Sequence, residues 1–408
     1  MNILIITPHF HPENFRINDF AEAFAGRGHS ITVLTSVPNY PAGRYFEGYG
    51  LFKNNREVYK GIHIYRIPVI PRGSGSPLRL AINYISYVVG GIFTSLFLMK
   101  KELDIIFVFE PSPITIGLPA IFIKKMKNIP IIFWVLDLWP ESVVSASSLK
   151  SSIVPNLLTP IVKFIYHHCD RILVSSKGFI NSISAKGVPK GKIEYYPQWA
   201  EPLFRPMSTD GYLLKSIPKD SFKIMFAGNI GEAQDFPSIV EAARLLKSNS
   251  NIHWIILGGG RKESWVRKKV EEYQLQDCFH LMGTFPLEKM PEFYSNADAM
   301  LFSLKREDIF ALTVPAKVQS YLACGKPILA MIDGEGASII EESDAGYTSP
   351  AETPDMLAEN ALRMATISPL QLLEMGQRAR KYYDENFERS FLFEKAESMF
   401  IAHHRDHS

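Results

Sequence analysis

The sequence has little cysteine, with Cys169, Cys278 and Cys324 the only three among 408 residues. They lie far apart and show no paired spacing, which excludes a disulfide scaffold, a zinc knuckle and a redox pair. Charged residues make up 21% of the chain and hydrophobic residues 46%, so the composition is neither that of a disordered protein nor that of collagen. We expect two to three domains of about 100–200 residues each, folded in a reducing cytosol.

The net charge of +2 hides an asymmetry between two parts of the chain. Residues 1–200 carry 21 basic and 12 acidic side chains, whereas residues 201–408 carry 23 basic and 30 acidic ones. A basic half favours an anionic partner, which could be nucleic acid, phospholipid or a phosphorylated substrate. A compositional difference without functional meaning explains the same counts equally well.

Several targeting and binding signatures are missing. Residues 1–7 are apolar but have no basic segment and no small-residue cleavage site, so we expect a buried strand there and not a secretory signal. The chain has neither a complete dinucleotide-binding fingerprint nor a GKS or GKT phosphate loop. No nucleic-acid-binding module can be recognised, so we expect no nucleic-acid partner.

Short apolar runs recur along the chain and alternate with helical patterns such as Phe15–Gly26. The pattern restarts after Tyr196–Asp220, a stretch that holds four prolines and fits a linker. The fold class expected is therefore α/β, with two Rossmann-like, doubly wound parallel-sheet domains facing a cleft. The expected strands are residues 1–7, 31–35, 62–67, 104–109, 131–136, 171–175, 222–227, 252–257, 279–282, 299–302 and 327–331. The expected domains are 1–200 and 221–385, joined by a linker at 201–220 and followed by a C-terminal helix within 386–408.

Residues 80–99 form an uncharged segment flanked by Arg79 and by Lys100 and Lys101. Its length suits a transmembrane helix, but the strands on both sides belong to one expected sheet, which argues against spanning. A stripe of small or polar residues recurs at helical spacing, and the rest of the circumference is apolar. This pattern favours a helix at a membrane interface, with its basic ends near lipid phosphates. A helix buried in the domain or in a dimer remains the alternative.

The second half holds two glycine-rich stretches after expected strands, Phe226–Gly231 and Leu257–Arg261. Glycine lets a ligand approach the backbone closely, although plain turns explain these stretches about as well. The segment Leu312–Pro327 predicts a loop, a helix started by Thr313 and Pro315, and a stop at Gly325. Backbone N–H groups of Val314, Ala316 and Lys317, together with the helix dipole and the lysine charge, would suit a diphosphate.

In the first half, the loop His9–Arg16 follows the first strand and gathers histidines, a carboxylate and an arginine. Asp137 and Glu141 follow another strand and should lie at the same sheet edge. Such a group can be an acid/base pair or a metal site. The spacing of His9 and His11 does not match a helical metal pair, so we expect no metal, and hydrogen bonds that merely shape the loop remain an alternative.

These residues resemble a known family. The segment His9–Thr35 resembles the opening of retaining GT-B glycosyltransferases of family 4, and Phe226–Gly231, Leu257–Gly260 and Pro315–Pro327 resemble their nucleotide-sugar half. The blocks Asp137–Ser142, Tyr196–Ala200 and Ser320–Pro327 look most like bacterial O-antigen, capsule and colanic-acid transferases, and among these like N-acetyl-L-fucosamine transferases. The resemblance runs over nearly the whole chain.

The resemblance implies a nucleotide-sugar donor in the second half, UDP-linked in preference and with N-acetyl-L-fucosamine as a candidate sugar. It implies that the first half binds the acceptor, a saccharide on undecaprenyl diphosphate, and that about residues 79–101 contact the cytoplasmic face of the membrane. It also implies that the C-terminal helix crosses back onto the first domain and that no cofactor or metal is required. Asp137, His9 and Glu13 are the expected catalytic residues, which orient the substrates. The expected substrate-binding residues are Arg16, Gly228, Asn229, Gln234, Gly258, Gly259, Arg261, Thr313, Val314, Ala316, Lys317 and Ser320.

The sequence departs from the family at its charged positions. Leu312 and Ser320 stand where the family has two glutamates, and Asn229 and Gln234 stand where it has an arginine and a lysine. Lys317, together with Arg261 and Arg16, is the candidate to replace the missing cations. A GT-B sugar-nucleotide epimerase and a non-catalytic nucleotide-sugar-binding subunit of a polysaccharide assembly remain the alternatives.

Overall fold

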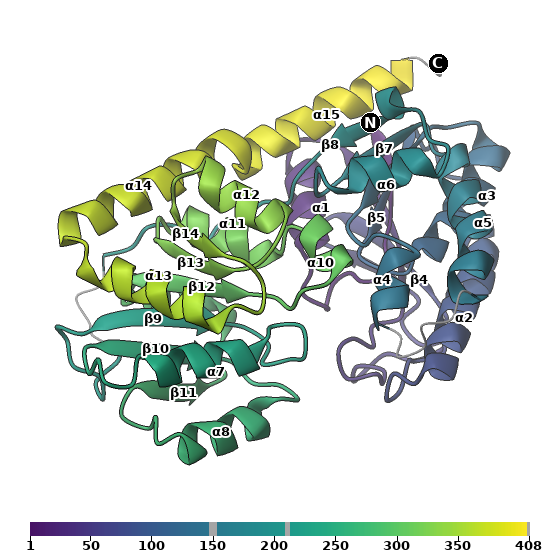
Figure 1. Cartoon of the computed structure of the whole chain (residues 1–408). Helices are drawn as coiled ribbons and strands as arrows, with labels where there is room; N and C mark the ends of the chain where they lie inside the picture. Colours follow the sequence, from purple (N-terminus) through teal and green to yellow (C-terminus); the bar gives the residue numbers. More distant parts are fainter. Residues whose placement is uncertain (147–152, 209–212, 406–408) are drawn as a thin grey trace. The chain divides into compact units, whose positions relative to one another are not determined.

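The computed structural model describes residues 1–146, 153–208 and 213–405, which divide into two compact units (Figure 1). Unit 1 comprises Met1–Pro197 and Phe393–Ser408, and unit 2 comprises Gln198–Leu392. Residues 209–212 of the expected linker and residues 406–408 of the expected C-terminal segment lie outside the described part of the chain.

Unit 1 is built on an eight-stranded sheet in the order β3-β4-β2-β1-β5-β6-β7-β8. All neighbouring strands are parallel except β3 and β4. The strands are β1 (Asn2–Ile6), β2 (Ser30–Ser36), β3 (Arg56–Tyr59), β4 (Ile62–Ile67), β5 (Ile105–Glu110), β6 (Ile131–Val135), β7 (Arg171–Val174) and β8 (Ile193–Tyr195). The central strands β5 and β6 are buried along their whole length, as expected of a parallel sheet that is covered on both faces, and Glu110 at the end of β5 is the one charged residue in them.

The helices of unit 1 are α1 (Arg16–Gly26), α2 (Pro77–Ser95), α3 (Gly117–Lys127), α4 (Glu141–Ala146), α5 (Ile153–His168) and α6 (Phe179–Ala185). In this unit α3 contacts both α2 and α5 (Figure 1). The last helix, α15 (Arg389–Arg405), packs on α1 through ring contacts of Phe393 and Phe400 with Phe20 and Phe24. Glu397 adds ion pairs to Arg27 and His29.

Unit 2 contains a parallel six-stranded sheet in the order β11-β10-β9-β12-β13-β14. Its strands are β9 (Phe222–Ala227), β10 (Ile252–Leu257), β11 (Phe279–Gly283), β12 (Ala299–Ser303), β13 (Ile328–Met331) and β14 (Gly346–Ser349). Its helices are α7 (Phe236–Leu245), α8 (Glu263–Glu272), α9 (Met290–Ser295), α10 (Asp308–Leu312), α11 (Ala316–Ala323), α12 (Glu335–Glu342), α13 (Pro354–Thr366) and α14 (Pro369–Asn386). Side chains of β9 alternate between two cores: Ile224 and Phe226 enter one, while Met225 and Ala227 enter the other.

All eleven expected strands are present, and each end differs by at most one residue. Three strands were not expected from the sequence: β3, β8 and β14. Each lies at the edge of its sheet, where pairing on one side suffices and a long apolar run is not required. The expected α/β fold class with two Rossmann-like units is thus confirmed.

Helix α2 begins at Pro77, and after Ser95 the chain continues as a 3₁₀ turn, Leu96–Leu98. Its small and polar side chains face the unit, whereas its apolar side chains are exposed. Gly90 and Gly91 belong to the buried stripe, where β-carbons would collide with Ile67 and Pro119. The buried residues are Asn83, Tyr87, Gly91, Thr94 and Ser95, and the exposed apolar ones are Leu78, Ile85, Val89, Phe93, Leu96 and Phe97. The segment Pro77–Leu98 is long and apolar enough to cross a membrane, which by itself is weak evidence because core helices pass the same test.

Candidate active site

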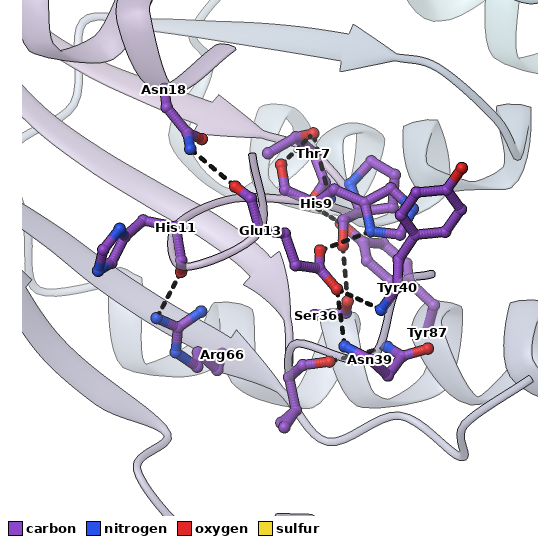
Figure 2. A network of polar contacts seen from close by, with 12 residues as sticks. Thr7, His9, His11, Glu13, Asn18, Ser36, Asn39, Tyr40, Arg66 and Tyr87 are labelled. Atoms are coloured by element: carbon purple, nitrogen blue, oxygen red, sulfur yellow. Dashed lines mark hydrogen bonds and ion pairs between the residues drawn. The ribbon is translucent and has the colours of Figure 1, made fainter. Parts of the chain in front are cut away.

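A buried polar network follows β1 at the carboxyl edge of the sheet in unit 1 (Figure 2). His9 Nδ1 lies 2.7 Å from Glu13 Oε2, and both side chains are almost completely buried. The imidazole stacks on Phe15 at 4.6 Å between ring centroids and contacts the ring of Tyr40 at 5.0 Å. The structure therefore brings two expected site residues together, and aromatic rings fix the plane of the histidine.

Glu13 is occupied on both carboxylate oxygens. Oε1 accepts hydrogen bonds from the backbone N–H groups of Asn39 (2.7 Å) and Tyr40 (2.6 Å), while Oε2 faces His9. A carboxylate opposite Nδ1 favours a proton on Nδ1, and in the neutral imidazole this makes Nε2 of His9 a hydrogen-bond acceptor. Glu13 thus holds His9 in orientation, and His9 is the member of the pair that can contact a ligand.

Arg66 supports this loop and was not found from the sequence. Its side chain is 1% exposed, and Nη2 donates to the carbonyl of His11 (2.8 Å) and to Glu57 Oε2 (2.6 Å). The guanidinium also lies over the ring of Tyr49. The only signal in the sequence was an arginine inside the strand β4, near its carboxyl end. Arg16, an expected substrate-binding residue, is the first residue of α1 and directly follows this loop.

Asp137 follows β6, two strands away from β1 in the sheet order. Trp139 Nε1 donates to Asp137 Oδ2 (3.0 Å) and lies 3.2 Å from Ser112 Oγ. Burial raises the pKa of Asp137, and hydrogen bonds from neighbouring side chains oppose that shift. Ser112 has φ = 113°, a conformation that costs a non-glycine residue about 1–3 kcal/mol and that often marks functional sites.

Helix α2 links the loops after β1 and β6. Tyr87 donates its hydroxyl to the carbonyl of Thr7 (3.2 Å), and the ring of Tyr84 packs edge-on against Trp139 at 5.9 Å. His9 and Asp137 therefore belong to one edge of the sheet, as expected. Glu141 contributes elsewhere: its Oε1 accepts from Ser182 and Lys186 of the α6 region, both at 2.6 Å.

In unit 2 the glycine-rich loops pack on each other. A β-carbon on Gly258 would lie 1.9 Å from the carbonyl oxygen of Gly228, and one on Gly260 would lie 2.5 Å from Asn229 Oδ1. All three glycines have positive φ, which side-chain-bearing residues rarely adopt. Close packing of two loops thus explains these glycines. The exposed Arg261 continues the second loop.

Asn229 and Gln234, the residues at the two family cation positions, lie around one glycine. The backbone N–H of Gly231 donates to Gln234 Oε1 (3.2 Å), and a β-carbon on Gly231 would meet both amide side chains. Gly259 faces Glu263 and Thr284. The loop after β9 therefore carries the neutral amide side chains of Asn229 and Gln234 at the two positions where the resemblance would place positive charges.

The helix of the Leu312–Pro327 segment starts differently from expectation. Pro315 is the N-cap residue of α11, whereas Thr313 terminates α10 and its hydroxyl donates to the carbonyl of Ile309 (2.7 Å). The expected role of Thr313 in starting the helix is therefore wrong, because its hydroxyl is hydrogen-bonded to the preceding helix α10. Gly325 ends the segment as expected, with φ = 64°.

Val314 and Ser320, two further expected substrate-binding residues, direct their side chains into the protein. Val314, just before α11, lies in the hydrophobic core, so only its backbone can face a ligand. Ser320 is buried and its hydroxyl donates to the carbonyl of Ala316 (3.4 Å). A ribose contact from Ser320, at the second family glutamate position, would require that hydrogen bond to break.

Lys317 lies between these loops and the start of α11. Its Nζ sits 4.0 Å from the ring centroid of Phe226, and a β-carbon on Gly228 would be 2.5 Å from Nζ. Within the described residues no carboxylate pairs with it. Burial lowers the pKa of Lys317 to about 7, so the amine is partly neutral at physiological pH. An anion placed here would restore the charge.

Two family models match the chain: "Glycosyl transferase 4-like domain" over residues 14–199 and "Glycosyl transferases group 1" over residues 215–382. The chain belongs to the glycosyltransferases. This glycosyltransferase is 30% identical to the glycosyltransferase WbjE of Pseudomonas aeruginosa, over 64% of this chain and 66% of that protein. It is 25% identical to the colanic acid biosynthesis glycosyl transferase WcaI of Escherichia coli, over 80% of this chain and 82% of that protein.

Solved structures resemble this glycosyltransferase in fold. The sucrose-phosphate synthase of Thermosynechococcus elongatus matches with a TM-score of 0.75 at 16% identity, covering 98% of both chains. Anabaena HepE, solved in complex with UDP and glucose, matches with a TM-score of 0.69 at 12% identity, covering 98% of this chain and 100% of that one. These likenesses agree with the two α/β units and show the GT-B fold.

Proposed function

We propose that this enzyme is a retaining glycosyltransferase of bacterial surface-polysaccharide assembly. It transfers a sugar from a nucleotide-sugar to a saccharide carried on polyprenyl diphosphate. The observation that carries the proposal is Lys317, a cation with no carboxylate partner in the described residues, held against Gly228 beside the start of α11. Relatives named for colanic acid and amylovoran biosynthesis support the polysaccharide assignment.

The donor half of the proposal rests on the charge of the leaving group. Breaking the bond between sugar and diphosphate builds negative charge on the leaving oxygen, and donors aimed at that oxygen stabilise it. Lys317 and the backbone N–H groups at the start of α11 are the proposed donors, and the dipole of the helix adds about half a positive charge. We propose that these protein groups take the place of a metal ion.

A UDP-linked sugar is the proposed donor class. HepE, which shares the fold, was solved with UDP and with UDP-glucose, and a UDP-binding relative favours the same base here. N-acetyl-L-fucosamine is the candidate sugar, on the resemblance of the sequence to transferases of that sugar.

The acceptor half of the proposal rests on His9 and Asp137. His9 Nε2 accepts a hydrogen bond from a substrate hydroxyl, with Glu13 fixing the imidazole, and the Asp137 carboxylate orients the acceptor saccharide. In a retaining transfer the acceptor arrives on the face from which the diphosphate leaves. The leaving phosphate oxygen can then take the acceptor proton, so no separate base is needed.

A peripheral position on the cytoplasmic face of the membrane completes the proposal. Helix α2 exposes apolar side chains such as Ile85, Val89 and Phe93. Arg79 lies in its first turn, and Lys100 and Lys101 follow its C-terminal end. An apolar face between basic ends suits the boundary between lipid tails and phosphates, where a polyprenyl acceptor resides.

The test begins with donor binding to the whole chain. UDP and UDP-sugars should raise the unfolding temperature more than GDP and GDP-sugars, because a ligand stabilises the state that binds it. Transfer onto a lipid-diphosphate saccharide is then measured with and without chelator, and activity should persist with chelator.

The decisive variant is Lys317→Ala, with Lys262→Ala as the matched control. Lys262 is a lysine near the loop after β10 that pairs with Glu232. Turnover of Lys317→Ala should fall at least about tenfold while its unfolding temperature stays near that of the wild type. Unchanged turnover in the folded variant would refute the assigned role. Uptake of solvent deuterium into the donor sugar without acceptor would indicate an epimerase instead.

A further inference from the structure

Glu110, the last residue of β5, is a buried acid that the proposed mechanism does not use. Its side chain is 0% exposed, and within the described residues no other side chain donates a hydrogen bond to either carboxyl oxygen. It pairs in the sheet with Val135, two residues before Asp137 on the neighbouring strand β6. Glu110 therefore lies at the carboxyl edge of unit 1, beside the strand that leads into Asp137.

Among the described residues, the groups that interact electrostatically with Glu110 are Asp137 after β6, Tyr84 of α2 and Tyr166 of α5, and none of them carries a positive charge. The hydroxyl of Tyr166 is itself buried and has no hydrogen-bond partner in the same part of the chain. Backbone N–H groups of Leu136 and Asp137 favour the ionised form, but burial and the charge of Asp137 outweigh them and raise the pKa of Glu110.

An isolated carboxylate in such a place is unfavourable. Moving an ion into the interior without a counter-charge costs several kcal/mol, and the group takes up a proton instead. Glu110 and Asp137 interact electrostatically, and two carboxyl groups that repel each other in a buried site retain one proton between them, because both cannot be ionised at low cost. The less buried member keeps the charge, and here that member is Asp137.

We propose that Glu110 is a protonated carboxylic acid in the working enzyme, so that the Glu110–Asp137 pair carries a single negative charge located on Asp137. Glu110 is then a positioning residue, which sets the charge of the group that meets the acceptor. This role rests on the proposed function of Asp137, whereas the protonation state of Glu110 does not.

Infrared spectroscopy of the whole, ligand-free chain tests the protonation directly. A protonated carboxyl has a C=O stretching band separate from those of carboxylates, and this band should be present at pH 7.5 and lost in Glu110→Gln. Glu102→Gln, which changes an exposed acid, should keep the band. Absence of the band from the wild type at pH 7.5, or its survival in Glu110→Gln, would overturn the proposal.

Stability against pH provides a second, independent readout. A folded-state pKa above the unfolded value of about 4.5 means that stability is lost as the pH rises from 4.5 toward the folded value. Glu110→Gln removes that loss, so its unfolding temperature relative to wild type should rise between pH 5 and pH 8. An equal difference at both pH values would show an ionised Glu110. Neither measurement needs substrate, so failure of the transferase assay leaves both results valid.

Discussion

The imidazole of His9 and the carboxylate of Glu13 lie 2.7 Å apart at the end of the first strand, and the backbone of the loop at Asn39 and Tyr40 holds the carboxylate in place. A histidine fixed in this way presents one defined nitrogen. The pair therefore gives the acceptor half of the enzyme an oriented hydrogen-bond acceptor, and the geometry leads to a specific prediction.

Glu13→Gln should change the tautomer of His9. The amide oxygen can still accept from the two backbone N–H groups, but its NH₂ then faces Nδ1 and forces the ring proton onto Nε2. His9 becomes a donor where an acceptor is needed, and kcat should fall about tenfold or more. Nitrogen NMR reports the tautomer, and Glu22→Gln, on the outer side of α1, is the control. Full activity with a changed tautomer would contradict the role of Nε2.

Donor binding should take up a proton at Lys317. Because the pKa of this amine is about 7 in the empty enzyme, a diphosphate must raise it on binding, and affinity for UDP should fall about tenfold for each pH unit above 7. Calorimetry in two buffers of different ionisation enthalpy should count about one proton taken up at pH 8.5. Lys317→Arg stays charged, so it should show no uptake. Equal uptake in wild type and variant would place the titrating group elsewhere.

Substitutions of the two loop glycines should differ in their effects. Gly258→Ala should destabilise the fold by about 3 kcal/mol or more, because its β-carbon would meet the carbonyl oxygen of Gly228. Gly228→Ala instead meets the mobile end of Lys317, so it should cost about 1–3 kcal/mol and weaken UDP binding. Denaturant unfolding measures both, and Gly191→Ala, which meets nothing within 4 Å, is the control. The reverse order would contradict the packing of the two loops.

The exposed face of α2 should be required for membrane binding. Phe93→Glu places a charge on a side chain that is 64% exposed, so folding should be unaffected while binding to anionic phospholipid vesicles falls about fivefold or more. Leu370→Glu on α14, also 64% exposed, is the matched control in unit 2. Vesicle co-sedimentation measures both variants. Equal binding of Phe93→Glu and wild type would remove α2 from the proposed membrane contact.

The alternation of strands and helices could be predicted from the sequence because the spacing of apolar residues over a short stretch distinguishes a buried strand from an amphipathic helix. Every central strand was found, since a strand buried on both faces needs a continuous apolar run. The edge strands β3, β8 and β14 were not found, because each is short and pairs on one side. Thr313 was assigned to the wrong helix, since two short helices adjoin there and a hydroxyl can serve either.

The candidate site was found only in part. His9, Glu13 and Asp137 could be named because polar residues at the carboxyl ends of apolar strands are informative. Lys317 could be named because a lysine at an expected helix start suits an anion. Arg66 and Glu110 were missed, since a single charge inside or at the end of an apolar strand has no local pattern that reveals its partners.

The sequence by itself determined the two α/β units, the order of most strands along the chain, the amphipathic pattern of α2 and the residue types at the carboxyl edges. Only the tertiary structure decided which of those residues are buried from solvent and which residues they contact. Lys317 is only partly charged near pH 7 because its amine is buried against Phe226 and Gly228, which lie about ninety positions away in the chain. Desolvation depends on atoms brought together by folding, so the charge state of a site residue is a property of the packed molecule.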